Sequence, residues 1–152
     1  MNKALIGAGC FWGIEEYYCK LPGVLDTKVG YSGGITKNPT YKDVCAGTSE
    51  HAEVVQILFD NKTISYLEIL DNFWLCHDPT QLNRQGLDVG SQYRSVIFYL
   101  SDDQKALALE SKKHKQLSIS KTIVTDIIPA KEFYLAEEYH QRFINKRAKN
   151  ET

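Results

Sequence analysis

The sequence predicts an α/β fold of the α+β type, a two-layer sandwich in which helices pack on a mixed, largely antiparallel sheet. Three observations predict it. Short runs of β-branched and apolar residues alternate with segments of helical period along the whole chain. Turn-forming Gly, Pro, Asn and Asp residues separate these segments. The 152 residues contain no repeat, low-complexity tract or linker, so residues 1–152 are expected to form a single domain.

The N-terminal part of the chain is expected to contain three strands and two helices. In chain order these are a strand at residues 4–6, a helix between Cys10 and Pro22, a strand at residues 24–31, a short helix after Thr40 and a strand at residues 53–59. Ile14, Tyr17 and Tyr18 recur at the helical period, and Pro22-Gly23 ends the first helix. Thr40 supplies a side-chain oxygen that can cap the second helix. The last of these strands is rich in β-branched and apolar residues.

The rest of the chain is expected to add two longer helices, two strands and a C-terminal tail. In chain order these are a helix from Ser65 to His77, a loop at residues 80–92, a strand at residues 93–100, a helix from Ser101 to about Ser118, a strand at residues 122–128, and a coil with a short helix over residues 133–140. The predicted buried face of the first of these helices carries Leu67, Leu70, Phe73 and Trp74. This order contains a ferredoxin-like βαββαβ core followed by a long C-terminal coil.

Composition and charge exclude several classes of protein. The 18 basic and 19 acidic residues nearly cancel and form no basic stripe, so no nucleic-acid partner is expected. No apolar run approaches the ~18 residues of a membrane span or forms a signal sequence, so we expect a cytoplasmic protein without a membrane partner. The four cysteines lack zinc-site and Cys-X-X-Cys spacing, which predicts free thiols, no bound metal and no bound cofactor. We expect a monomer.

The run Gly9-Cys10-Phe11-Trp12-Gly13 is the strongest candidate for a site, because it places a thiol at the junction of a strand and a helix. A helix N-terminus favours thiolate over thiol, so we expect the pKa of Cys10 to be lowered and its sulfur to be a nucleophile. Phe11 and Trp12 would form an exposed apolar wall that accepts a small nonpolar group. The alternative is a buried structural cysteine between core aromatic residues.

Acidic and phenolic side chains elsewhere in the chain are candidates to act with Cys10. Glu53 stands at the entry of an apolar strand, where partial desolvation would raise its pKa and make it a general acid. The alternative is an ordinary edge-strand glutamate that faces water. The glycine-containing loop places Asp88 and Tyr93 where both can point into one pocket, as can Tyr41. The alternative for this loop is a solvated tip.

Several motifs occur together in one order. They are Gly-Cys-Phe-Trp-Gly at 9–13, Gly-Tyr-Ser-Gly-Gly at 30–34, Pro-Thr-Tyr at 39–41, His-Ala-Glu-Val-Val at 51–55, His-Asp-Pro-Thr at 77–80, Asn-Arg-Gln-Gly at 83–86, Gln-Tyr-Arg-Ser at 92–95 and Ala-Glu-Glu-Tyr-His-Gln at 136–141. Through these motifs the chain resembles the A-type peptide methionine sulfoxide reductases, from about Ala4 to Phe143. The resemblance implies a single catalytic domain that reduces methionine S-sulfoxide, free or in proteins, to methionine.

The resemblance also implies a role for each candidate residue. Cys10 would attack the sulfoxide sulfur and become a sulfenic acid, while Glu53 would protonate the departing oxygen. Tyr41 and Tyr93 would hydrogen-bond that oxygen and stabilise its developing charge. The remaining roles are the binding of the substrate methyl group by Phe11 and Trp12 and the support of the hydrogen-bond network by Asp88.

Two departures from the family pattern bear on this reaction. Glu50 adds a carboxylate before the His-Ala-Glu element, where the family commonly has glycine. Residues 145–152 contain none of the recycling cysteines that many members carry in the tail. We therefore expect an external reductant for the sulfenic acid, such as thioredoxin, glutaredoxin or a small thiol. The expected partners are this reductant and the substrate, either oxidised proteins or free methionine sulfoxide.

Geometry limits the other cysteines as recycling thiols. Cys19 lies nine residues beyond Cys10 on one predicted helix, a rise of about 13.5 Å, whereas the Cα atoms of a disulfide lie within about 7 Å. Cys45 lies four residues after Tyr41 on the same helical face, and is the second choice as a possible resolving residue. Cys76 cannot be placed from the sequence.

Two other classes of function compete with the reductase. In a cysteine acyltransferase or hydrolase, His51 or His77 would act as the base for Cys10. A redox sensor, or a module that binds oxidised methionine, would need no catalysis. Glu53 with two phenols favours the reductase, because acyl transfer needs a histidine partner more than it needs an acid. The structural interpretations of His77, His114 and His140 are a helix end, a solvated helical face and a helix surface.

Overall fold

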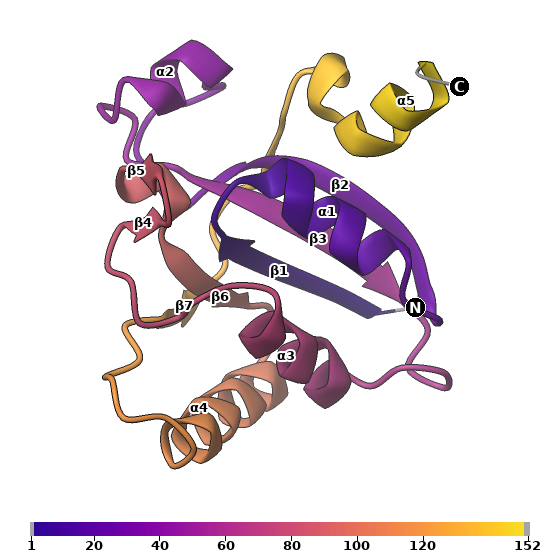
Figure 1. Cartoon of the computed structure of the whole chain (residues 1–152), viewed down its shortest axis with the longest axis vertical. Coiled ribbons are helices and arrows are strands. Elements are labelled where there is room, and N and C mark those ends of the chain that lie inside the picture. The colour runs from indigo at the N-terminus through magenta and orange to yellow at the C-terminus, as the bar shows by residue number, and fades with distance from the viewer. Residues whose placement is uncertain (1, 151–152) are drawn as a thin grey trace.

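The computed structural model describes the backbone of residues 2–150 and the side chains of residues 2–147, and it has the predicted two-layer α/β architecture (Figure 1). The strands of its sheet are β1 Asn2–Ala8, β2 Val24–Ser32, β3 Ala52–Phe59, β6 Ser95–Tyr99, β7 Asp126–Pro129 and β8 Tyr134–Leu135. The helices are α1 Phe11–Cys19, α2 Tyr41–Cys45, α3 Tyr66–Leu75, α4 Asp102–Gln116 and α5 Phe143–Asn150. A separate hairpin consists of β4 Arg84–Gln85 and β5 Asp88–Val89, and short 3-10 turns span Ser91–Tyr93 and Glu138–His140.

The sheet has the order β7-β6-β1-β3-β2-β8, and its four central strands have ferredoxin-like connectivity. Each neighbouring pair within β6-β1-β3-β2 is antiparallel. β7 adds a parallel strand at one edge, and β8 adds an antiparallel strand at the other. The mixed, largely antiparallel sheet is therefore confirmed. Because β1 and β3 run in opposite directions, the end of β1 lies beside the start of β3, which brings Cys10 towards Glu53.

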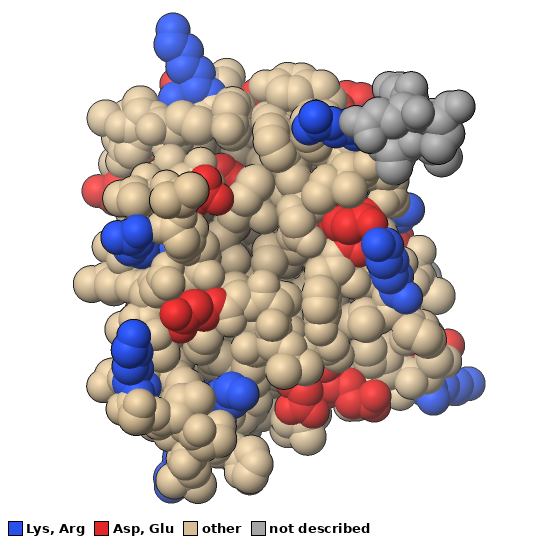
Figure 2. Space-filling model, viewed as in Figure 1, with Lys and Arg blue, Asp and Glu red and all other residues tan. Residues whose placement is uncertain are grey.

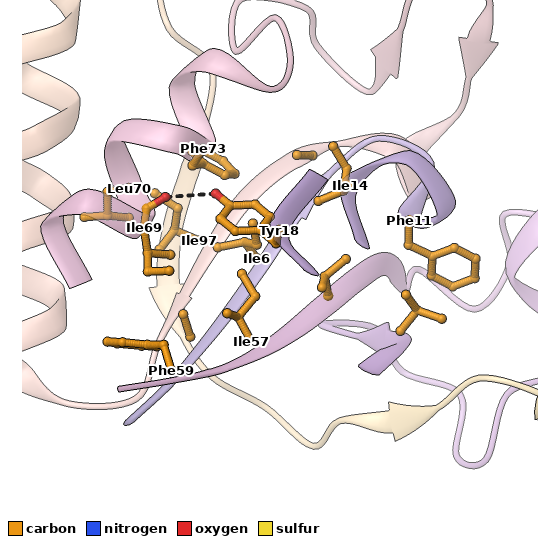
Figure 3. Packing of buried hydrophobic residues seen from close by; sticks show 14 of the residues in the cluster. Ile6, Phe11, Ile14, Tyr18, Ile57, Phe59, Ile69, Leu70, Phe73 and Ile97 are labelled. Carbon is orange, nitrogen blue, oxygen red and sulfur yellow. Dashed lines mark hydrogen bonds between the residues drawn. The ribbon is translucent and has the colours of Figure 1, made fainter. Parts of the chain in front are cut away.

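The main hydrophobic core lies between one face of the sheet and the helices. Ile6, Ile57 and Ile97 project from β1, β3 and β6 and are completely buried (Figure 3). The hydroxyl group of Tyr18 in α1 donates a hydrogen bond of 2.8 Å to the backbone oxygen of Ile69 in α3, so the two helices are linked above these strands. The two helices therefore cover the sheet as one layer.

The second face of the sheet carries a smaller apolar cluster. Leu5, Val54 and Phe98 point to this face, as the twofold alternation of side chains along a strand requires. Ile128 and Phe133, from the segment between β7 and β8, pack against them. Since β7 and β8 lie at opposite edges of the sheet, this segment crosses the second face and delivers the C-terminal tail to the edge beside β2.

Charged residues of both signs are scattered over the face shown in Figure 2. Within the part of the chain that the structure describes, no helix has the length and apolar character needed to cross a lipid bilayer. Neither sign dominates the visible face, and the formal net charge of the whole sequence is -1.

Four local predictions differ from the structure. The strand expected from residue 93 begins at Ser95, because Tyr93 closes a 3-10 turn through its N–H bond to Gly90. The last main strand is Asp126–Pro129 rather than residues 122–128, and the chain beyond residue 140 continues into α5. The loop at residues 80–92 contains a hairpin whose two-residue turn, Gly86-Leu87, has Gly86 at a φ of 59°.

The buried face of α3 also differs in one residue. Leu67 was expected on it, but 44% of its surface is exposed. The buried residues of this helix are Tyr66, Ile69, Leu70, Phe73 and Trp74. Leu67 shares a helical spacing with Leu70 and Trp74, so the periodicity is compatible with two overlapping faces, and packing against the sheet selects the one without Leu67.

Substitution of two leucines in this helix should separate core from surface. Leu70→Ala should reduce the free energy of unfolding by about 2–5 kcal/mol, since it opens a cavity at a fully buried position. Leu67→Ala, the same chemical change in the same helix, should cost less than about 1 kcal/mol. Urea unfolding followed by circular dichroism measures both. Equal losses would contradict this assignment of the buried face.

Candidate active site

Cys10 lies between the end of β1 and the first turn of α1, as predicted, and its side chain is half-buried. Gly9 before it has a φ of 104°, which an L side chain rarely adopts. A Cβ atom at Gly9 would also lie 2.8 Å from Cγ of Gln85, so glycine permits the β4–β5 hairpin to pack directly beside the cysteine. Two segments far apart in the sequence therefore meet at this thiol.

Burial raises the pKa of the Cys10 thiol to about 11. The backbone N–H groups of Trp12 and Gly13 at the start of α1 act in the opposite direction, but the negative charges of Glu53 and Asp88 add to the effect of burial. The expectation of a lowered pKa is therefore wrong. The helix N-terminus contributes as expected, and desolvation with two nearby carboxylates outweighs it.

Glu53 is buried in the interior of the sheet, with 1% of its surface exposed. Its Oε1 atom accepts a hydrogen bond of 3.2 Å from the backbone N–H of Phe11, and its Oε2 atom is buried without a protein partner. Burial raises the pKa of Glu53 to about 7; the Phe11 N–H opposes this shift, and Asp88 adds to it. The edge-strand alternative is wrong, because β3 lies between β1 and β2. Glu53 can thus hold a proton near neutral pH.

The two predicted phenols, Tyr93 and Tyr41, lie close enough to Glu53 for its negative charge to contribute to their pKa values. Tyr93 ends the 3-10 turn after the hairpin, and burial raises its pKa to about 12, with further contributions from Glu53, Cys45, Asp88 and Cys10. Tyr41 is the first residue of α2, and its pKa is also raised, by a hydrogen bond with Cys45, by burial and by the charge of Glu53. Both phenols therefore remain protonated at neutral pH and can donate hydrogen bonds. Asp88, exposed on β5, belongs to the same cluster.

The two aromatic residues after Cys10 occupy different environments. Phe11 is only 1% exposed and packs against the rings of Tyr31 and His140, so the expectation of an exposed pair is wrong for this residue. Trp12 is half-buried, and its indole ring stacks on Phe143 at 3.9 Å between centroids. Trp12 thus supplies the more accessible of the two rings, while Phe11 packs in the core beside it.

Sequence reasoning assigned His140 to a helix surface, and this assignment is wrong. His140 is 1% exposed, and its Nδ1 atom accepts a hydrogen bond of 2.9 Å from the indole N–H of Trp12. Its ring also lies 4.5 Å from the ring of Tyr41. Since Nδ1 is an acceptor, the proton of the neutral ring is on Nε2, which is buried without a partner. The motif at residues 136–141 was the available signal for this contact.

The other two histidines considered as bases are committed to structural hydrogen bonds. His51 Nδ1 accepts a bond from the Gly34 N–H, and its Nε2–H donates to the backbone oxygen of Thr36. His77 bonds through Nδ1 to the Phe73 oxygen and through Nε2 to the Ser95 hydroxyl group, and burial lowers its pKa to about 4. Neither ring is available to take a proton from Cys10, which argues against acyl transfer.

The remaining cysteines differ in their relation to the site. Cys19 donates a hydrogen bond to the Glu16 backbone oxygen at the far end of α1. Cys76 donates to the Phe73 backbone oxygen, and burial raises its pKa to about 12. Cys45 is exposed and interacts with the phenol of Tyr41, so it is the one of these three that contributes to the cluster around Glu53.

The fold and site together define a class of protein. A thiol and a carboxylic acid that can hold a proton near neutral pH lie with two protonated phenols, and the candidate histidine bases are occupied elsewhere. Within the part of the chain that the structure describes, no three His, Cys, Asp or Glu side chains are grouped so that they could hold a metal ion. The thiol, the carboxylic acid and the two phenols are the groups of a cysteine-based oxidoreductase.

Comparison with known proteins identifies the family. A family model described as peptide methionine sulfoxide reductase matches residues 2–152. Peptide methionine sulfoxide reductase A1 of Arabidopsis thaliana is 54% identical over 140 residues, which cover 92% of this chain and 69% of that protein. The enzyme MsrA of Methanothermobacter thermautotrophicus is 55% identical over 147 residues, which cover 95% of this chain and 87% of that protein. The chain therefore belongs to the peptide methionine sulfoxide reductase family and is an oxidoreductase that reduces methionine sulfoxide.

Solved structures agree with this assignment. Reduced Mxr1 from Saccharomyces cerevisiae superimposes with a TM-score of 0.92 at 39% identity, over 97% of this chain and 86% of that one. Mxr1 in complex with Trx2 gives a TM-score of 0.66 at 28% identity, over 93% of this chain and 84% of that one. The similarity in structure thus extends over nearly the whole chain.

The pKa of Cys10 can be tested by alkylation. Because burial raises that pKa to about 11, reaction of Cys10 with iodoacetamide should be slow at neutral pH and should accelerate about tenfold per pH unit up to about pH 10. Peptide mass spectrometry follows Cys10 and the exposed Cys45 in the same sample. In Glu53→Gln the increase of the Cys10 alkylation rate with pH should begin at lower pH, since one negative charge near the thiol is removed. A rate at Cys10 that does not change between pH 7 and 9 would show a thiolate instead.

Proposed function

We propose that this chain reduces the S epimer of methionine sulfoxide, free or in proteins, with Cys10 as nucleophile and Glu53 as general acid. The observation that carries the proposal is the buried carboxyl group of Glu53, whose pKa lies at about 7 and whose Oε2 atom has no protein partner. An acid of this kind suits protonation of an oxygen that leaves a sulfur atom at neutral pH. The choice of epimer rests on the resemblance to the A-type reductases.

The proposed reaction balances within the site. The thiolate of Cys10 attacks the sulfoxide sulfur, and the proton of Glu53 passes to the sulfoxide oxygen. The sulfur–sulfur bond formed by this attack and the sulfur–oxygen bond of the substrate then break as the hydroxyl group is transferred to the sulfur of Cys10, and methionine leaves. The substrate sulfur is reduced by two electrons, and the sulfur of Cys10 is oxidised by two electrons to a sulfenic acid.

One proton is shared between the two reacting groups. With a pKa of about 7 for Glu53 and about 11 for Cys10, the pair holds a single proton through the mildly alkaline range, mostly on the sulfur. The reactive arrangement has the same proton on Glu53 and a thiolate at Cys10. The reaction therefore needs no net proton uptake from water before the attack, only transfer between these two groups.

The surrounding residues supply binding and charge stabilisation. We propose that the protonated phenols of Tyr41 and Tyr93 donate hydrogen bonds to the sulfoxide oxygen as negative charge develops on it. Trp12, held by His140, provides an apolar surface for the substrate methyl group, and Phe11 packs in the core next to it. Asp88, on β5, orders the β4–β5 hairpin beside Cys10.

Return of Cys10 to the thiol requires two further thiol equivalents. A thiol condenses with the sulfenic acid to give a mixed disulfide and water, and a second thiol releases Cys10 by exchange. We propose that a thioredoxin, a glutaredoxin or a small thiol supplies them; the structural likeness to Mxr1 solved with Trx2 favours a thioredoxin. Cys45 is the internal alternative. The proposal places the enzyme in the cytoplasm as a monomer with one catalytic domain.

The shared proton has a signature in the pH profile. In the unmodified enzyme the single-turnover kcat/KM should rise with pH to about 7 and then level, because each gain in thiolate is matched by a loss of carboxylic acid. In Glu53→Gln the rate at pH 7 should be lower by roughly 100-fold or more. It should then keep rising about tenfold per pH unit, since the thiolate fraction alone limits it. Methionine formation measured by chromatography tests this, and full activity in Glu53→Gln at pH 7 would exclude the general-acid role.

Oxidation of the enzyme without a reductant distinguishes the two routes of recycling. Each enzyme molecule should form about one methionine, and Cys10→Ser should form none, because the hydroxyl acceptor is Cys10. Mass spectrometry should find one added oxygen on the Cys10 peptide, and after treatment with dimedone a dimedone thioether in its place. A Cys10–Cys45 disulfide, seen as the loss of two hydrogens across both peptides, would instead establish the internal route. Cys19→Ser is the matched control and should leave the burst unchanged.

A further inference from the structure

The carboxylate of Glu137 connects the C-terminal tail to the segment that carries Tyr41. Its Oε2 atom accepts a hydrogen bond of 3.0 Å from the backbone N–H of Tyr41, the first residue of α2. Its Oε1 atom accepts a hydrogen bond of 3.0 Å from the hydroxyl group of Tyr31, which is fully buried on β2. One side chain from the tail therefore bridges the sheet and the start of α2.

The turn that carries Glu137 is itself firmly attached. The N–H of Ala136 donates a hydrogen bond of 3.0 Å to the Val29 oxygen. The side chain of Gln141 accepts from the Val29 N–H at 2.9 Å and donates to the Val29 oxygen at 2.8 Å. The N–H of Arg142 donates a hydrogen bond of 2.6 Å to the buried carboxyl group of Glu15. Glu137 thus projects from a backbone that is fixed on both sides.

The helix that Glu137 holds is short. α2 has five residues, and its capping hydrogen bonds, between Thr40 and Asp43, lie within the helix itself. Val44 is its fully buried residue. The bond to Glu137 fixes the backbone of the residue whose phenol must reach the sulfoxide oxygen. The ring of His140, on the same tail turn, also contacts the Tyr41 ring at 4.5 Å between centroids.

We propose that Glu137 is a positioning residue for Tyr41, which it holds so that the phenol points at the oxygen that leaves the substrate. The proposal rests on the role of Tyr41 in the proposed function. Burial raises the pKa of Glu137, but the hydrogen bonds from Tyr41, from its own backbone and from Tyr31 lower it below the usual value. Glu137 is therefore ionised at neutral pH and accepts both bonds as a carboxylate. Small errors in the placement of a catalytic group can cost up to roughly 100-fold in rate.

Four variants test this role by single-turnover methionine formation. Glu137→Ala removes both acceptor atoms, and Glu137→Asp withdraws the carboxylate by one methylene; each should lower the rate roughly tenfold or more, in kcat rather than in KM. Glu137→Gln should stay close to the unmodified enzyme, since its amide oxygen can accept from Tyr41 and its amide N–H can donate to the Tyr31 oxygen. Glu138→Ala is the matched control, because Glu138 is the adjacent residue and its side chain is 87% exposed.

Combination with Tyr41→Phe separates positioning from general destabilisation. In the Tyr41→Phe background, Glu137→Ala should cause no further loss, because the group it positions is gone. Three results would each overturn the proposal. The first is a double variant whose loss in rate equals the product of the two single losses. The others are a Glu137→Gln enzyme as slow as Glu137→Ala and a Glu137→Asp enzyme as fast as Glu138→Ala. Thermal unfolding checks that each variant is folded, and the Asp and Gln variants carry the test if the Ala variant does not fold. Full activity in Tyr41→Phe would exclude both the proposed role of Tyr41 and the positioning role of Glu137. A slow Tyr41→Phe enzyme together with a fully active Glu137→Ala enzyme would exclude the positioning role alone.

Discussion

The burial of one carboxyl group in the interior of the sheet is the constraint on which the site depends. Antiparallel pairing of β1 with β3 sets Glu53 beside the end of β1, where α1 begins and presents the N–H of Phe11 to Oε1. That single bond does not replace the lost hydration, so the pKa of Glu53 rises to about 7. The position of the acid therefore follows from strand register, and its strength follows from the layer of helices above it.

The same burial explains why Cys10 is a protonated thiol, and not a thiolate, at neutral pH. A thiolate would lie close to the ionised Glu53 in a poorly hydrated region, and the two N–H groups at the start of α1 cannot compensate for both effects. For sulfoxide reduction this is a consistent arrangement, because the reaction consumes a proton as well as a nucleophile. A site with a strongly acidic thiol and an ionised carboxylate would hold the nucleophile but lack the proton.

Sequence reasoning succeeded where local pattern determines the result. The alternation of strand and helix segments predicted the sheet and its helical layer, and Cys10 lies at the predicted junction of strand and helix before α1. It failed where remote contacts decide. Leu67 matched the helical period, but its exposure depends on how α3 meets the sheet. His140 contacts Trp12 across 128 residues, and neither hydrophobic periodicity nor helix spacing indicates such a contact. The pKa of Cys10 is likewise raised by burial in the folded chain and by the charges of Glu53 and Asp88 from other strands.

The C-terminal tail supports the proposed site even though residues 133–152 contain no cysteine. It crosses the second face of the sheet, adds β8 to β2, and returns to the helical side, where one turn places His140 against Trp12 and Glu137 against Tyr41. Trp12 and Tyr41, which are proposed to bind the substrate methyl group and the sulfoxide oxygen, thus both contact the same turn. Glu137 and His140 are three residues apart, one turn of 3-10 helix, so a single backbone element contacts both Tyr41 and Trp12. The contacts of the tail with Trp12 and Tyr41 do not depend on a recycling thiol in it.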